Sequence, residues 1–487
     1  MKAGISGQRA SRSGIDRLRI LAIAAGIIWS VLFVVAGLHY ELQMYGDGSI
    51  FSYSVAVQDA WGFHYHNISG RLFVYLSSFL PAETYVALSK DARGGIVVYG
   101  LLFFVAQLLG LAATFAADRS RGRVIFSYAC FSAALLCPLV FGAPTEMWMA
   151  HALFWPALAV CHYARKGVAE AALIFVLLLA LVFTHEGAVI FAFAILATLL
   201  LRGKRDLAFR RAAGALLVAM PIWVAVKIAF PPDDYIADVL VHNALHVFDI
   251  EILAGGLVIL LLAAFASYAV IFLVLRWLDV SNAHIVAAAV VAAALAIYWL
   301  WFDQAFHSQN RYFLRTLILA GTPVLGVLAA AYALAAGGQL NPPVAMLPRL
   351  MAALTNWVAV RAATGAFLLA MLIHAVETAK FTTAWTDYKV AVRALATGAA
   401  SDPALGDPRF VSSHRIGGKL NRLSWDSTTH FLSVLVSPNF APARLVVDPT
   451  ASYFWLSCKT ATESLAAGRA VPAQSRRLVR IHACLHR

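Results

Sequence analysis

Long apolar segments separated by short polar ones recur along the chain. Between Leu18 and Val376 they reach about 17 to 25 residues, the length that a helix needs to cross roughly 30 Å of hydrocarbon. In lipid the backbone must satisfy its own hydrogen bonds, so such segments are expected to be helices. The pattern predicts an all-α polytopic membrane protein of about 11 transmembrane helices, at residues 18–38, 96–117, 124–142, 147–164, 168–184, 187–201, 212–230, 253–276, 283–302, 316–336 and 357–376.

The composition agrees with a membrane protein and differs from that of a soluble enzyme. Of the 487 residues, 61% are hydrophobic and only 13% are charged. The net charge of +13 comes mostly from Lys and Arg clustered at the ends of apolar segments. This placement is typical of membrane topology rather than of a nucleic-acid-binding surface. We therefore expect membrane lipids, and no nucleic acid, as partners.

The basic clusters fall on one side of the membrane when the segments are threaded in order. The positive-inside rule then places the N-terminus in the cytoplasm and the C-terminus outside, as in a multi-pass protein of the bacterial inner (plasma) membrane. The basic N-terminal tail and the first apolar segment are expected to be a retained anchor. The first outer loop is expected at residues 39–95, and "FTHEGA" (183–188) is expected to be the outer turn of a hairpin of two short helices.

Two domains are expected. Residues 1–376 would form the transmembrane module, and residues 377–487, which have no further apolar span, would form a small α+β periplasmic domain. In the latter, residues 383–395 have a helical pattern, and "RLVVDP" and "SYFWLSC" resemble short strands. Cys458 and Cys484 can form a disulfide outside the cytoplasm, and unpaired thiols are the alternative.

The expected outer side contains almost all the unusual polar residues. Asp47 lies in "YGDGSIF" soon after the first span, where its carboxylate can act as a general base or as a turn residue. Asp59, His64 and His66 follow among aromatic residues that suit a helix at the interface. The two His residues are two apart, so they do not imply a chelating pair, and we expect them to bind a diphosphate or sugar hydroxyls. Arg71 is expected to form an ion pair or to bind a phosphate.

Further candidates lie at the outer ends of later spans. Glu146 in "PTEMW" suits a helix start as well as a site, whereas His151 would lie inside the outer leaflet, where ionisable groups usually face a cavity. His185 and Glu186 are expected to line such a cavity, with a structural ion pair as the alternative. Arg311 and Arg315, four residues apart on one helix face, can bind a phosphate in forked hydrogen bonds.

These residues and this topology together resemble the GT-C superfamily of polyprenyl-phosphate-dependent membrane glycosyltransferases. The resemblance covers essentially the whole chain and is carried mainly by topology. It implies that Asp47 is the catalytic base, with Asp59 as a fallback because Asp47 lies alone between glycines. It also implies that Glu146 places the acceptor or a metal, and that Arg311 and Tyr312 in "NRYF" lie near the lipid phosphate.

The activity that this resemblance implies is an inverting transfer of a sugar from a polyprenyl-phosphate donor to a glycan or lipid acceptor at the outer face of the membrane. The sequence leaves the need for a divalent metal ion open. An O-antigen polymerase or ligase is the main alternative, although its large outer loop usually falls late in the chain. A lipid-linked sugar flippase or transporter is the other alternative, although the sequence shows no clear inverted repeat.

Overall fold

The computed structural model is almost entirely helical. It describes residues 2–61, 71–137, 145–163, 165, 167–203, 206–230, 241, 245, 249, 255–307, 313–340, 349, 353–398, 410–424 and 428–447.

A helix lies in each of the eleven apolar segments. They are α1 (Lys2–His39), α6 (Ala92–Phe104) with α7 (Ala106–Ala117), α8 (Val124–Leu136), α9 (Glu146–Tyr163), α10 (Val168–Val182), α11 (Ala188–Leu199), α12 (Leu207–Ala229), α15 (Gly256–Trp277), α16 (Ala283–Ile297), α17 (Phe313–Ala336) and α19 (Trp357–Thr397). Among the described residues, eight helical segments are long and apolar enough to cross a membrane. The chain is thus a polytopic helical membrane protein, and the number of eleven crossings stays a prediction.

The expected first outer loop is itself mostly helical, which corrects the description of residues 39–95 as a loop. A 3₁₀ turn, η1 (Leu42–Met44), precedes α2 (Asp47–Ala56). The helical segment Leu72–Ser89 then joins α4 (Leu72–Val74), the π-helical turn η2 (Tyr75–Phe79) and α5 (Leu80–Ser89), and it is one of the eight segments that are long and apolar enough to cross a membrane. Pro81 and Glu83 interrupt the apolar residues of this helix, and the apolar pattern therefore did not predict it.

Small residues allow the central helices to approach closely. A Cβ atom added at Gly110 of α7 would lie 2.4 Å from the carbonyl oxygen of Ala152 on α9, closer than any real contact of this kind. Lipid tails are as apolar as side chains, so packing between membrane helices depends on such close backbone approach. The contact therefore holds α7 against α9, the helix that begins at Glu146.

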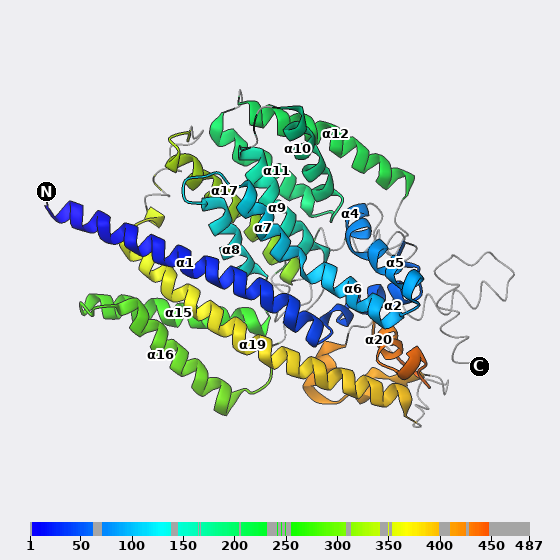
Figure 1. Cartoon of the computed structure of the whole chain (residues 1–487). Coiled ribbons are helices and arrows are strands. Elements are labelled where there is room, and N and C mark those ends of the chain that lie inside the picture. Colours follow the sequence, from blue (N-terminus) through cyan, green and yellow to red (C-terminus); the bar gives the residue numbers. More distant parts are fainter. Residues whose placement is uncertain are drawn as a thin grey trace.

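Helix α19 is the longest element and lies beside α1 along most of its length (Figure 1). Its 41 residues rise about 60 Å, twice the thickness of the hydrocarbon core. The expected domain boundary between residues 376 and 377 falls inside this continuous helix, so the predicted helical run at 383–395 is the extension of the last apolar segment. The hairpin of α15 and α16 packs against α19 on the other side (Figure 1).

The region after α19 packs on the extended part of that helix and on α2. It contains two short parallel strands, β1 (Phe410–Ser412) and β2 (Leu445–Val447), in which Val411 pairs with Val446. Between them lie the 3₁₀ turns η7 (Ser413–Arg415), η8 (Gly418–Leu423) and η9 (Pro438–Phe440) and the helix α20 (Thr429–Leu435). The strand predicted at "RLVVDP" is confirmed as β2, whereas "SYFWLSC", Cys458 and Cys484 lie outside the described residues.

We expect Gly110→Ala to destabilise the protein by about 1–3 kcal/mol, because the added methyl group would push α7 away from α9. Gly214→Ala on α12 is the matched control, since its Cβ would meet no atom within 4 Å and should leave stability equal or slightly higher. Thermal unfolding of the two variants in detergent checks this. Equal stability of both would show that the close approach is not required.

Candidate functional site

A buried ion-pair network joins four segments that are distant in sequence. Arg71, which precedes α4, lies with Nη1 2.9 Å from Glu146 of α9 and with Nη2 2.6 Å from Glu186, in the turn between α10 and α11. Arg71 Nε also donates to Glu186, at 2.9 Å, so that contact is forked. Lys227 of α12 completes the network, 2.6 Å from the other oxygen of Glu186. We call these four residues the ion-pair network.

The charges of the ion-pair network balance, which explains how it tolerates burial. Burial acts to raise the pKa of Glu186, but Arg71, His185 and Lys227 outweigh it and hold that pKa well below its ordinary range. Burial likewise acts to lower the pKa of Arg71, and the Glu146 and Glu186 carboxylates together raise it instead. Glu186 and Arg71 are therefore charged at neutral pH. The network holds the adjoining ends of α9, α10, α11 and α12 to the segment before α4.

Asp47 begins α2, and its position depends on the residue before it. Gly46 has φ +57°, a conformation that glycine adopts without strain, and the helix starts directly after it. The Asp47 side chain is half-buried and lies within electrostatic reach of the Tyr99 hydroxyl, as does Glu146. That hydroxyl is buried and has no hydrogen-bond partner among the described residues. Tyr99 thus lies between the candidate base and the ion-pair network.

Asp59 lies beyond the other end of α2. The ten residues of that helix rise about 15 Å, so Asp47 and Asp59 are too far apart to act on the same atom. The main chain N–H of Asp59 donates to the carbonyl of Ser54, which ends the helix. Only Asp47 lies on the side of Tyr99 and Glu146.

The two candidate His residues at described positions differ in surroundings. His151 is fully buried between α7, α8 and α9, with Nδ1 2.8 Å from Gln107 and Nε2 2.7 Å from Ser132. Both ring nitrogens are used, so this geometry favours helix packing over substrate contact. The Nδ1 atom of His185 accepts a hydrogen bond from the N–H of Gly187, which shapes the turn that presents Glu186.

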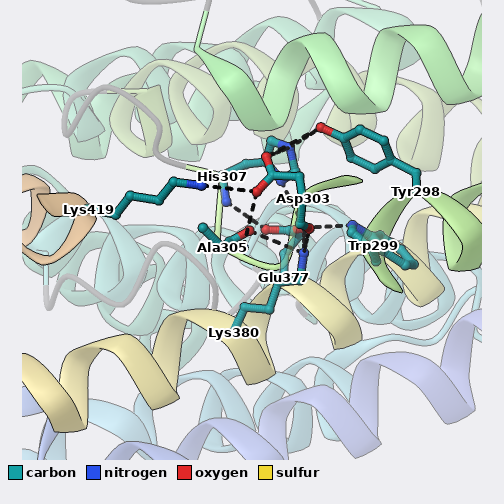
Figure 2. Close-up of polar contacts among 8 residues, drawn as sticks. All are labelled: Tyr298, Trp299, Asp303, Ala305, His307, Glu377, Lys380 and Lys419. Atoms are coloured by element: carbon teal, nitrogen blue, oxygen red, sulfur yellow. Dashed lines mark hydrogen bonds and ion pairs between the residues drawn. The ribbon is translucent and has the colours of Figure 1, made fainter. Parts of the chain in front are cut away.

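A second polar group lies shortly after the end of α16, and of its members only His307 was among the unusual polar residues expected on the outer side. We call Asp303, His307, Glu377 and Lys380 the outer polar cluster, after the side of the membrane on which the predicted topology places it (Figure 2). Glu377 on α19 is fully buried and accepts hydrogen bonds from the Trp299 indole at 3.0 Å and from the His307 main chain at 2.8 Å, while its Oε1 lies 2.9 Å from His307 Nδ1. Lys380 donates to the carbonyl oxygens of Asp303 and Ala305.

Asp303 lies on the side of the outer polar cluster that is partly open to solvent. Burial acts to raise its pKa, but the Ala305 N–H and the nearby Lys419 and His307 outweigh this and lower the pKa. Lys419, from the region after α19, lies 3.3 Å from the Asp303 carboxylate (Figure 2). The cluster therefore joins the end of α16, the middle of α19 and the C-terminal region.

An apolar groove between α15 and α16 ends at the outer polar cluster. Its volume is about 650 Å³, and its lining is almost wholly aliphatic from Leu260 to Leu295, with Tyr298, Asp303 and His307 at one end. A row of aromatic rings connects this end to the start of α2. Phe306 packs on Phe381 of α19 with ring centroids 6.1 Å apart, and Phe381 packs on Tyr45, two residues before Asp47, at 5.2 Å. The groove and Asp47 thus flank the same part of α19.

A polar pocket of about 400 Å³ lies beside η1, the turn that precedes α2. It is lined by Met44, three residues before Asp47, by Glu41 and by the basic residues Arg93, Lys389 and Arg393. Lys389 lies 2.5 Å from Glu41, and Arg93 donates to the Ser437 carbonyl, whereas Arg393 is exposed. The pocket therefore has a positive wall and opens beside α2.

Several predicted site residues lie outside the described part of the chain. These are His64, His66, Arg311 and Tyr312; Arg315 is in the first turn of α17, but its side chain is not described. Among the residues that the structure does describe, no three His, Cys, Asp or Glu side chains are grouped to hold a metal ion.

The sequence analysis missed Lys227, Tyr99, Glu377 and Lys380 as members of these groups. Tyr99 and Lys227 lie within or at the end of apolar helices and show no pattern. Glu377 and Lys380 lie three residues apart on one face of α19. Their spacing would have indicated a polar site if the last apolar segment had been predicted to continue as a helix beyond residue 376.

Comparisons with protein-family models, with curated proteins and with solved structures find no match for this chain.

We expect Arg71→Gln to lower the stability of the folded protein by about 3–5 kcal/mol, because it leaves two buried carboxylates without their shared partner. Arg71→Lys should cost less, since it keeps the charge but not the forked contact. Lys419→Gln removes an exposed pair and should cost less than about 1 kcal/mol. Denaturant titration in detergent compares the three, and an equal effect of the Gln variants would contradict the role of the network.

The ion-pair network also predicts a pH dependence of stability. The pKa of Glu186 is lower in the folded protein than its ordinary value of 4.5, so its contribution is complete above that value and is lost as the pH falls through the folded pKa. We therefore expect the difference in Tm between the wild type and Glu186→Gln to be constant from about pH 7 to pH 5.5 and to shrink below about pH 4.5. A difference that grew on acidification would contradict this assignment.

Proposed function

We propose that this protein is an inverting glycosyltransferase that moves a sugar from a polyprenyl-phosphate donor to a glycan or lipid acceptor at the outer face of a bacterial inner membrane. One observation carries the proposal: an apolar groove ends in a polar cluster, and a row of aromatic rings connects this end of the groove to the start of the helix that begins at Asp47. A lipid-linked sugar has the same division into a long apolar tail and a polar reacting end.

The groove between α15 and α16 suits the lipid tail of the donor. Apart from Ser267, its lining along the tail is apolar, and the exposed aliphatic side chains of both helices would face lipid, from which such a tail can enter sideways. The phosphate would then lie near the outer polar cluster, and because Lys380 and Lys419 are paired there with Glu377 and Asp303, further cations would have to bind it. Arg311 and Arg315 follow this cluster in the chain, and their contact with the phosphate stays a prediction.

In the proposed reaction the Asp47 carboxylate takes the proton of the acceptor hydroxyl. The acceptor oxygen forms a bond to C1 of the sugar as the bond between C1 and the phosphate oxygen breaks, so the configuration at C1 inverts. The electron pair of the broken bond leaves with the polyprenyl phosphate. Nearby cations stabilise the charge that develops on that phosphate.

The ion-pair network acts as a frame for this site rather than as a proton carrier. Each of its carboxylates is held by a cation, which makes Glu146 and Glu186 poor bases. Its contact with α9 fixes Glu146, which, like Asp47, lies within electrostatic reach of the Tyr99 hydroxyl. The acceptor would approach through the polar pocket beside Met44, whose positive wall suits an anionic or hydroxyl-rich glycan.

The test is transfer from synthetic undecaprenyl-phosphate hexoses, with an envelope glycolipid extract as acceptor. Released undecaprenyl phosphate is measured by mass spectrometry, because this product is the same for every sugar. We expect release by the wild type and a loss of about 100-fold or more in Asp47→Asn, the size expected for removal of a general base. Asp387→Asn, an exposed carboxylate on α19, is the control and should behave as the wild type.

Two results would contradict the proposal in different ways. Full activity of Asp47→Asn with loss in Asp59→Asn would move the base to the other end of α2. No release by the wild type from any donor in the panel would contradict the proposed donor class as a whole.

A further inference from the structure

A small pocket lies at the opposite end of the α15–α16 hairpin from the outer polar cluster. It has a volume of about 120 Å³ and is lined by Phe272, Arg276, Asp279, His284 and Arg361, with the aliphatic residues Val280, Ala283 and Val358. Three helices build it: α15 supplies Arg276, α16 supplies His284 and α19 supplies Arg361. None of these residues belongs to the site proposed above.

The cations of this pocket lack protein partners. Within the described part of the chain, neither Arg276 nor Arg361 forms a hydrogen bond or an ion pair, and Arg361 only stacks on the Trp357 ring, 3.6 Å from its centroid. Arg361 is also repelled by both Arg276 and Arg17 of α1. The lining of the pocket holds two guanidiniums and one carboxylate, that of Asp279, which leaves one positive charge uncompensated. This contrasts with Arg71, which has two carboxylate partners.

A second observation points to a missing ligand. His284 is buried, with 8% of its surface exposed, and its Nδ1 atom has no hydrogen-bond partner among the described residues. Buried polar atoms are normally satisfied, and an orphan in a pocket indicates a ligand or water that completes it. Two forked donors and a ring nitrogen facing one small cavity form a set that suits the oxygens of a phosphate.

The position of the pocket indicates the kind of molecule to which this phosphate belongs. Trp277, directly after Arg276, is 82% exposed, and the exposed faces of α15 and α16 are aliphatic along their length. An exposed Trp at the end of an apolar helix is typical of the membrane interface. The pocket is also at the end where α1 begins, the side that the basic clusters assign to the cytoplasm. Basic pockets between membrane helices on that side typically bind the head groups of anionic lipids.

We propose that Arg276, His284 and Arg361 bind the phosphate of an anionic phospholipid in the leaflet opposite to the catalytic site. The lipid would hold α15, α16 and α19 together at the end of the hairpin far from the outer polar cluster. This inference does not depend on the proposed glycosyl transfer.

The test uses the full chain in a neutral detergent, titrated with phosphatidylglycerol, with phosphatidylcholine and with inorganic phosphate, and binding is followed by native mass spectrometry. Phosphatidylglycerol should bind in preference to the other two. The double variant Arg276→Gln/Arg361→Gln should bind phosphatidylglycerol on the order of tenfold or more weakly. The matched control is Arg119→Gln/Arg121→Gln, which removes two exposed charges without polar partners at the same end of the bundle, and its binding should stay within about twofold of the wild type.

Several outcomes would overturn the proposal. Equal weakening by the two double variants would show only general attraction to anionic lipid, and equal binding of phosphatidylcholine would show that the head group is not recognised. Inorganic phosphate that competes as well as the lipid would identify an anion site instead of a lipid site. If the Gln variant does not fold, Arg276→Lys/Arg361→Lys keeps the charge but removes the forks, and undiminished binding would likewise contradict the proposed contact.

Discussion

The ion pairs of Arg71 with Glu146 and Glu186 determine how the adjoining ends of α9, α10, α11 and α12 are arranged. A charge taken out of water is costly unless it is paired. Here one cation compensates a carboxylate on α9 and a carboxylate in the turn between α10 and α11, and Lys227 also pairs with the latter. The helices that bear these groups cannot separate without leaving a charge unpaired. The network therefore holds these helix ends together, as close packing at Gly110 holds α7 against α9.

Helix α19 connects this frame to the rest of the site. Because it is about twice as long as the hydrocarbon is thick, its first half packs with α1, α15 and α16, and its second half packs with the region after residue 410. Glu377 and Phe381 lie near the middle of the helix. The outer polar cluster, the end of the apolar groove and the aromatic row to Tyr45 therefore all meet at one place on one helix.

Paired and unpaired charges separate two kinds of polar site in this protein. In the ion-pair network and around Glu377 every charge has a protein partner, which suits a rigid frame. In the pocket of Arg276 and Arg361 the cations lie near each other and near a buried imidazole nitrogen, and none of these groups has such a partner among the described residues, which suits a ligand. An unpaired charge in a membrane is costly. In the ion-pair network the protein itself provides the partners, whereas in the pocket of Arg276 and Arg361 we propose that a ligand provides them.

The sequence by itself determined where the helices are. Apolar length predicted a helix in all eleven segments, because a backbone in lipid must form its hydrogen bonds within the segment, and "RLVVDP" predicted β2. It also singled out Arg71, Glu146 and Glu186 as unusual, but not their pairing, since the partners are 115 residues apart in the case of Arg71 and Glu186. Only the tertiary structure decided that Lys227 joins them, that Glu377 is buried inside a continuous helix, and that an apolar groove ends at the outer polar cluster. Such contacts depend on how helices pack, and the pattern along one helix does not contain that information.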